Sequence, residues 1–160
     1  MKSFIDKNGE TWDLELNIGT AMRLQSRLDI NIENCINLDS NKPKDISLLE
    51  RITEDSILLF NIIYVLCETQ VREQSLTEEE FAERFSGDTI AAATDALLDE
   101  IENFSRPAKR KILKRLRQIS QEISDEAGEK MDQLFEDPKF KEALEAALQK
   151  LSTNSPEFSE

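Results

Sequence analysis

Residues 57–67 have the sequence Ile-Leu-Leu-Phe-Asn-Ile-Ile-Tyr-Val-Leu-Cys, and this stretch decides the fold. When it is wound as a helix, it is apolar on every side and is interrupted by Asn61. A helix without a polar face must lie at the centre of a core. The preceding Thr53-Glu54-Asp55 can start a helix, and the length of the run favours a helix over a strand despite its β-branched residues.

A short β-hairpin is predicted at the N-terminus, over residues 3–17. Asn8-Gly9 lies between two runs of strand-forming residues, and an Asn-Gly pair tolerates the positive φ of a tight turn. The residues that alternate with acidic ones after this turn are Trp12, Leu14 and Leu16. This period of two puts one apolar face inward, so Trp12 is predicted to be a core contact rather than a binding anchor.

Helices are predicted from about residue 18 onward. The start signals are Asn17 before a helix over 18–28, Ser47 or Asp45, a capping box from Thr77 to Glu80, Asp88, Pro107, and Asp137-Pro138. Residues 29–45 are predicted to be an irregular connection that can hide a short helix around 32–38. The chain is therefore predicted to be mainly α, with one helical domain over residues 1–151 and a disordered tail over 152–160.

The helix that follows Pro107 is predicted to be long and amphipathic. Its apolar residues recur at a spacing of three or four, which is typical of one helical face. They are Ile112, Leu116, Ile119, Ile123 and Ala127, continued by Met131, Leu134 and Phe135. A last helix is predicted to carry Ala143, Leu144, Ala147, Leu148 and Leu151.

The composition argues against an enzyme. Histidine is absent, which removes the usual general base and zinc ligand, and the four glycines form no phosphate-binding loop. Acidic clusters at 78–80, 99–102 and 122–129 are predicted to be solvated helix faces rather than metal ligands. We therefore predict no catalytic residues, no cofactor and no metal site.

The same sequence indicates a cytoplasmic protein. The N-terminal residues contain no apolar segment of signal-peptide length, and the longest apolar run is too short to span a membrane. Cys35 and Cys67 are predicted to be free thiols in a reducing compartment. The net charge of −13 disfavours nucleic acid as a partner and favours a protein with a basic or mixed surface.

Basic residues are concentrated between residues 106 and 117, where the chain has seven of its 20 lysines and arginines and no acid. We define this basic run as Arg106, Lys109, Arg110, Lys111, Lys114, Arg115 and Arg117. Most of it falls on the helix face opposite the apolar stripe. It is the candidate protein-binding site for an acidic partner, with two alternatives: a solvated face, or an internal counterpart to the acidic helices.

The N-terminal thirty residues resemble the opening of a phage protein family, the tail assembly chaperones of long-tailed (siphovirus-like) bacteriophages and prophages. The resemblance is carried by Phe4, by Gly9-Glu10-Thr11-Trp12-Asp13-Leu14-Glu15-Leu16-Asn17, by Ala21, Leu24 and Leu28, and by Asp29-Ile30-Asn31-Ile32. The apolar helix over 57–67 and the Thr-Glu-Glu helix start at Thr77 extend the similarity to about residue 105.

The resemblance implies a non-enzymatic protein of the bacterial host cytoplasm. Such a chaperone coats the long, helical tape-measure protein, keeps it soluble and helps to recruit tail-tube subunits, then leaves before the virion is finished. The sequence leaves self-association open. Two alternatives also remain open: a structural head–tail or tail component of a phage, and an acidic regulator that binds a basic partner.

Overall fold

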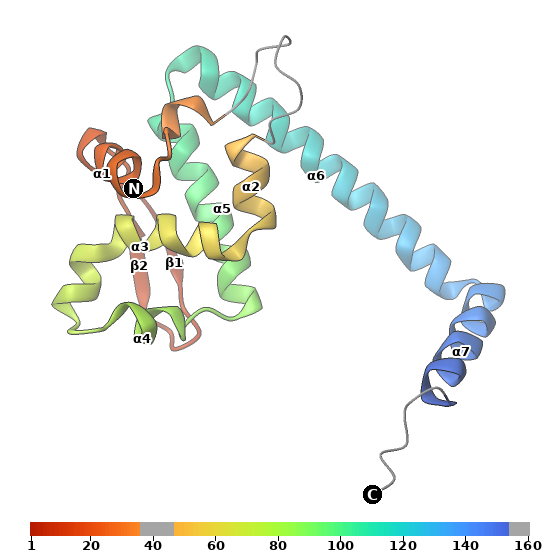
Figure 1. Cartoon of the computed structure of the whole chain (residues 1–160). Coiled ribbons are helices and arrows are strands. Elements are labelled where there is room, and N and C mark those ends of the chain that lie inside the picture. Colours follow the sequence, from red (N-terminus) through yellow and green to blue (C-terminus); the bar gives the residue numbers. More distant parts are fainter. Residues whose placement is uncertain (36–46, 154–160) are drawn as a thin grey trace, which may run out of the picture. The chain divides into compact units, whose positions relative to one another are not determined.

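The computed structural model describes residues 1–35 and 47–153, and it confirms the predicted mainly α fold with an N-terminal hairpin. The described residues form seven α-helices, one short 3-10 helix and one two-stranded sheet (Figure 1). They divide into two compact units, unit 1 over residues 1–111 and unit 2 from Ile112 onward. The boundary falls inside the span 1–151 that the sequence predicted as one domain.

The predicted hairpin is formed by strands β1 (Lys2–Ile5) and β2 (Thr11–Leu14). They are antiparallel, with Phe4 opposite Trp12. Gly9 takes the positive φ of 87° that the turn requires, which glycine adopts without a steric cost. Trp12 is 0% exposed, so its predicted role as a core contact is confirmed.

Helix α1 (Ile18–Leu28) begins where the sequence predicted it. The Asn17 side chain accepts from the backbone of Thr20, and the Thr20 hydroxyl accepts from the backbone of Asn17. This reciprocal pair satisfies two amides that have no partner inside the helix. In the connection that follows, a 3-10 helix occupies Ile32–Asn34, and the rest of the short helix predicted around 32–38 lies largely outside the described residues.

Four more whole helices follow in unit 1. They are α2 (Leu48–Glu54), α3 (Ser56–Glu73), α4 (Glu78–Ala82) and α5 (Gly87–Phe104). The predicted capping box of Thr77 and Glu80 starts α4. Helix α5 begins one residue earlier than predicted from Asp88, because the Ser86 hydroxyl accepts the Thr89 amide and serves as the N-cap.

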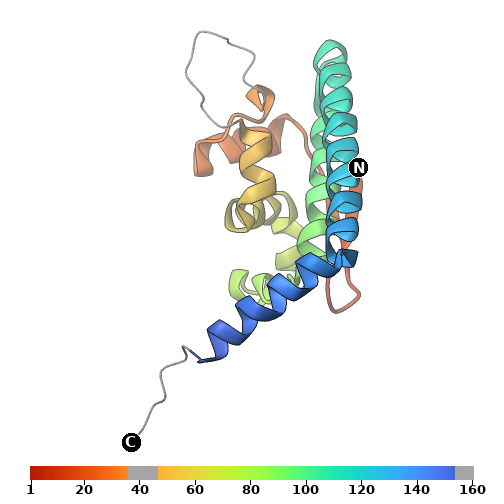
Figure 2. The same cartoon turned by 90° about the vertical axis from the view of Figure 1, so that its right-hand side faces the viewer.

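The core of unit 1 is built around α3. Strand β1 packs against α5 and strand β2 against α3, and both views place the hairpin alongside α5 (Figures 1 and 2). The middle of α3 is buried on most of its circumference, through Leu59, Ile62, Ile63, Val65, Leu66 and Cys67. The predicted central position is therefore confirmed for these turns, whereas Ile57 at the start of α3 is 74% exposed.

Polar side chains of helices α3 and α5 form hydrogen bonds with the backbone of the hairpin. Glu100 of α5 is 6% exposed and accepts from the backbone amides of Lys2 at 3.1 Å and Leu16 at 3.2 Å. Gln70 of α3 accepts from the Asp13 amide at 3.0 Å and donates to the Asp13 carbonyl at 2.7 Å. The hairpin therefore obtains partners for its edge amides from helices far along the chain.

The Ile62→Ala variant should lower the free energy of unfolding by about 2–5 kcal/mol, the usual cost of emptying a buried site in a packed core. Ile62 is 0% exposed, so no solvent can fill the space without a penalty. Urea denaturation followed by circular dichroism would measure the loss. Ile57→Ala, an equal truncation at the exposed start of the same helix, is the control and should change stability by less than about 0.5 kcal/mol. A loss that small at Ile62 would contradict its place in the core.

Helix α6 (Pro107–Glu136) crosses the boundary between the units, and unit 2 contains its remainder together with α7 (Pro138–Thr153). The chain changes direction between them (Figure 1), where the Asp137 carboxylate accepts the Lys139 amide at 3.0 Å. Phe135 and Phe140 meet edge to face across this junction. Because α7 extends to Thr153, the first two residues of the predicted 152–160 tail are helical, and residues 154–160 lie outside the described residues.

Candidate protein-binding site

The seven residues of the basic run have different surroundings. The Arg110 guanidinium donates to the carbonyls of Asn103 and Ser105 at 3.1 Å and to that of Glu102 at 3.3 Å. The last carbonyls of a helix have no partner inside it, and a cation there also opposes the helix dipole. Arg110 is therefore part of the end of α5.

Lys109 also contacts the body of unit 1, since its ammonium donates to the backbone carbonyl of Glu33 in the 3-10 helix. Lys109 and Arg106 line a hollow of about 360 Å³ together with Glu33, Phe104, Ser105 and Ala108. The remaining members lie along α6: Lys111, Lys114 and Arg115 are exposed, and Arg117 is half-buried. The structure thus does not bring the seven residues into one pocket, and their binding role stays a prediction.

Exposed apolar side chains gather on the two C-terminal helices. Ten large ones between Ile112 and Leu151 are 37% to 70% exposed. They are Ile112, Leu116, Ile119, Ile123, Met131, Leu134, Phe135, Leu144, Leu148 and Leu151. In the described part of α6 a single side chain, Leu113, is buried.

Two groups of these residues follow the helical period. We call Ile112, Leu116, Ile119, Ile123 and Met131 the α6 stripe, and Leu144, Leu148 and Leu151 the α7 stripe. Single exposed apolar residues are normal, as at Met22 and Ile57 of unit 1. A continuous apolar series on one helix face is instead typical of a surface that packs against another helix. The sequence predicted both amphipathic faces but not their exposure.

Neither a family model, nor a curated protein, nor a solved structure matches the chain. Over residues 1–35 and 47–153, no three His, Cys, Asp or Glu side chains converge as ligands for a metal ion. No helix in the described part of the chain combines the length and apolarity of a membrane span.

A second group of polar contacts surrounds Asp6 in the hairpin turn. Its carboxylate accepts from the Trp12 indole at 2.9 Å, the Asn8 and Glu10 amides at 2.8 and 3.0 Å, and the Arg84 guanidinium at 3.2 Å. Burial alone would raise the pKa of Asp6, but these hydrogen bonds outweigh it, and the pKa lies below its ordinary value. Asp6 is thus held ionised and fully bonded, which suits a structural role.

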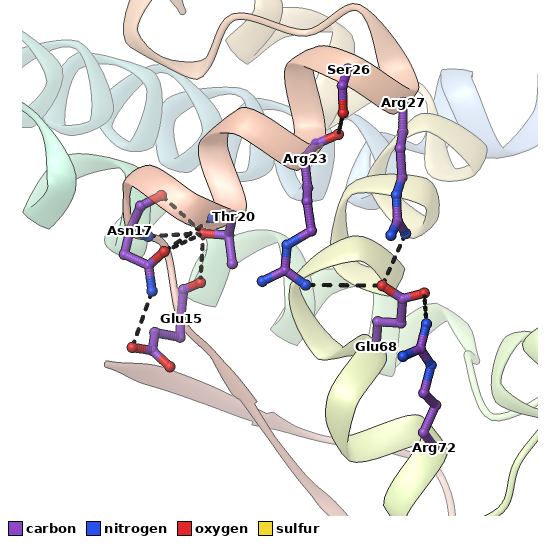
Figure 3. A network of polar contacts seen from close by, with 8 residues as sticks. All are labelled: Glu15, Asn17, Thr20, Arg23, Ser26, Arg27, Glu68 and Arg72. Carbon is purple, nitrogen blue, oxygen red and sulfur yellow. Dashed lines mark hydrogen bonds and ion pairs between the residues drawn. The ribbon is translucent and has the colours of Figure 1, made fainter.

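A third group centres on Glu68 of α3, which three arginines surround (Figure 3). One carboxylate oxygen is 2.9 Å from Arg27 and 3.9 Å from Arg23, both on α1, and the other is 2.8 Å from Arg72. The pairs from Arg23 and Arg27 join α1 to α3. Sequence reasoning missed this group, although Arg23 and Arg27 stand four residues apart on one face of a predicted helix.

The two cysteines, which were predicted to be free thiols, are free and buried in the structure. Burial raises the pKa of the Cys67 thiol to about 12, and the nearby Asp13 charge adds to the effect. Burial also raises the pKa of Cys35, although the Lys109 charge opposes this in part. Both thiols are therefore protonated near neutral pH and are poor nucleophiles. Cys35 was expected in a polar connection but is 0% exposed, because Ile30 and Ile32 beside it are buried as well.

Proposed function

We propose that this protein is a non-enzymatic tail assembly chaperone that binds the tape-measure protein of a long-tailed phage or prophage and helps to recruit tail-tube subunits. The observation that carries the proposal is the exposed α7 stripe of Leu144, Leu148 and Leu151. A tape-measure chain is long and helical with apolar stripes of its own. Two such stripes exclude water from each other when their helices pack together.

The resemblance to tail assembly chaperones supports the same reading from another part of the chain. It covers residues 4 to about 105, which is nearly the whole of unit 1. Unit 1 has a closed core with its buried carboxylates bonded and its thiols protonated, and this arrangement offers little to a reaction. The net charge of −13 would keep a complex with an apolar client soluble.

Apolar contact should provide most of the affinity for the client, at about 25 cal/mol per Å² of buried apolar surface before the costs of association. The exposed cations of the basic run would add electrostatic steering, which salt screens. Binding should therefore persist at about 0.5 M salt, where the Debye length is only a few ångströms. An acidic or basic partner held by charge would instead be released.

Co-expression with the tape-measure protein of its own locus should raise the solubility of that protein and give a complex of several copies that co-purifies at high salt. In the Leu144→Glu/Leu148→Glu double variant, which places two charges in the α7 stripe, we expect at least about a tenfold loss of affinity. Met22→Glu is the matched control, because it adds a charge at an exposed apolar position of unit 1. It should bind like the wild type.

Several outcomes would contradict this proposal. A tape-measure protein that stays insoluble, or that separates from this chain on a sizing column at low salt, rules out the chaperone function. Equal binding by the double variant and the wild type would remove the α7 stripe from the contact. A complex that forms only at low salt would favour the acidic regulator instead.

A further inference from the structure

Charge is separated along α6 into a basic first half and a mainly acidic second half. Lys111, Lys114, Arg115 and Arg117 lie in its first half, and Glu122, Asp125, Glu126, Glu129 and Asp132 in its second. The first turn of α6 has no acid and the last turn has no base. Such a separation places two strongly charged halves of opposite sign on one helix. A neighbouring helix with the reverse order of charges would compensate for both.

The basic half of α6 contains no acid of its own. Ion pairs within a helix join residues three or four apart, and the stretch from Arg106 to Arg117 is free of Asp and Glu. The same helix exposes the α6 stripe, whose five members are 37% to 61% exposed. A separation of charge into two halves and an exposed apolar stripe thus coincide on one helix, and a helix with the reverse order of charges and its own apolar stripe would complement both.

We propose that this partner is the α6 helix of a second copy of the chain, packed antiparallel along the α6 stripe. The basic half of each helix then lies beside the acidic half of the other, and the two dipoles are opposed. A parallel pair would instead bring like charges together. The symmetry is two-fold, so the same surface of each copy forms both sides of the contact.

The apolar sequence specifies the register of this pair. With the two-fold axis near Gln121, Ile112 of each copy faces Met131 of the other, Leu116 faces Ala127, and Ile119 faces Ile123. Every layer is then apolar on both sides over about 30 Å of helix, given the rise of about 1.5 Å per residue. This single register covers every residue of the α6 stripe in both helices.

The edge of the stripe provides a charged pair that tests the register. At about 100° per residue, Arg115 and Glu126 lie on the same edge of the α6 stripe, and both are exposed. In a two-fold antiparallel pair, this edge of one helix lies against the same edge of the other helix. Arg115 of one helix is therefore close to Glu126 of the other. The contact occurs twice.

The α7 stripe takes no part in it and stays available to a client, so self-pairing goes beyond the proposed function and does not depend on it.

Sedimentation equilibrium of the full chain tests the proposal. The wild type should have twice the mass of its 18.4 kDa chain at a concentration of about 0.1 mM. Arg115→Glu or Glu126→Arg alone should raise the dissociation constant at least about tenfold, since each places like charges together at two points. Mixing these two variants should restore the dimer, because each of the two contacts in the mixed pair again joins one acidic and one basic side chain.

Matched controls separate this contact from a general effect of charge. Lys141→Glu and Glu145→Arg make similar charge reversals on α7 and should leave the dimer unaffected. Ile119→Glu should give a monomer with the wild-type helix content by circular dichroism, which distinguishes lost pairing from lost folding. A wild-type monomer at about 0.1 mM, or single variants that fail to pair when mixed, would overturn the proposal.

Discussion

Replacing Phe81 by alanine should lower the free energy of unfolding of unit 1 by about 3–5 kcal/mol, the cost of deleting a fully buried aromatic ring. The Phe81 side chain is 0% exposed and lies at the centre of an aromatic cluster. Its ring centroid is 4.6 Å from that of Trp12, 5.2 Å from Phe85 and 5.7 Å from Phe60. The truncation therefore removes contacts with β2, α3 and the segment after α4 together.

Guanidinium denaturation followed by tryptophan fluorescence would measure this loss, because Trp12 is the single tryptophan and is one of the rings in contact. Phe140→Ala removes an identical side chain from unit 2 and is the matched control. It should leave the transition reported by Trp12 unchanged within about 0.5 kcal/mol. A loss below about 1 kcal/mol for Phe81→Ala would show that the aromatic cluster does not hold α4 to the core.

Asp6→Ala should destabilise unit 1 by about 3–5 kcal/mol, the effect of removing one partner from a buried ion pair. The Asp6 side chain is fully buried, and Arg84 is 18% exposed. Without the carboxylate, the Trp12 indole, the Arg84 guanidinium and two turn amides all lose their acceptor. Asp6→Asn keeps the shape and one acceptor oxygen, so it should cost less than the alanine variant.

The free energy of unfolding measured at acidic pH would also report the contribution of the Asp6 carboxylate. Because the pKa of Asp6 is lower in the folded than in the unfolded chain, its contribution is fully present above the unfolded value of about 4 and is lost as the pH falls through the folded value. The gap in unfolding free energy between the wild type and Asp6→Asn should therefore narrow below about pH 4. A gap that stays constant down to about pH 2 would contradict a depressed pKa.

Local sequence signals predicted most of the elements. The Asn17 cap, the Thr77–Glu80 capping box and Pro107 at the first position of α6 each satisfy or remove amides within a few residues of themselves. Such interactions are encoded by spacing along the chain, so one sequence suffices to find them. The same holds for the period of two that placed Trp12 inside.

Partners far apart in the sequence could not be predicted in this way. Asp6 binds Arg84 across 78 residues and Arg27 binds Glu68 across 41, and no local pattern connects them. For the candidate site, the sequence identified the basic run as one strip, yet the turn between α5 and α6 brings Arg110 back to the end of α5. It identified both apolar faces on α6 and α7, while their exposure depends on what the rest of the chain leaves uncovered.

The hydrogen bonds between the hairpin region and Glu100 affect how the protein folds during its synthesis. The hairpin is synthesised before α5, and the carboxylate that binds the Leu16 and Lys2 amides is made 84 and 98 residues after them. Contacts of such long range are slow to form. The backbone amides that Glu100 binds therefore stay without this partner until α5 emerges. Translation then continues through α6 and α7, so the nascent chain can close unit 1 while its apolar C-terminal stripes are still being made. Slow codons placed after α5 would therefore favour correct folding more than slow codons placed within the hairpin.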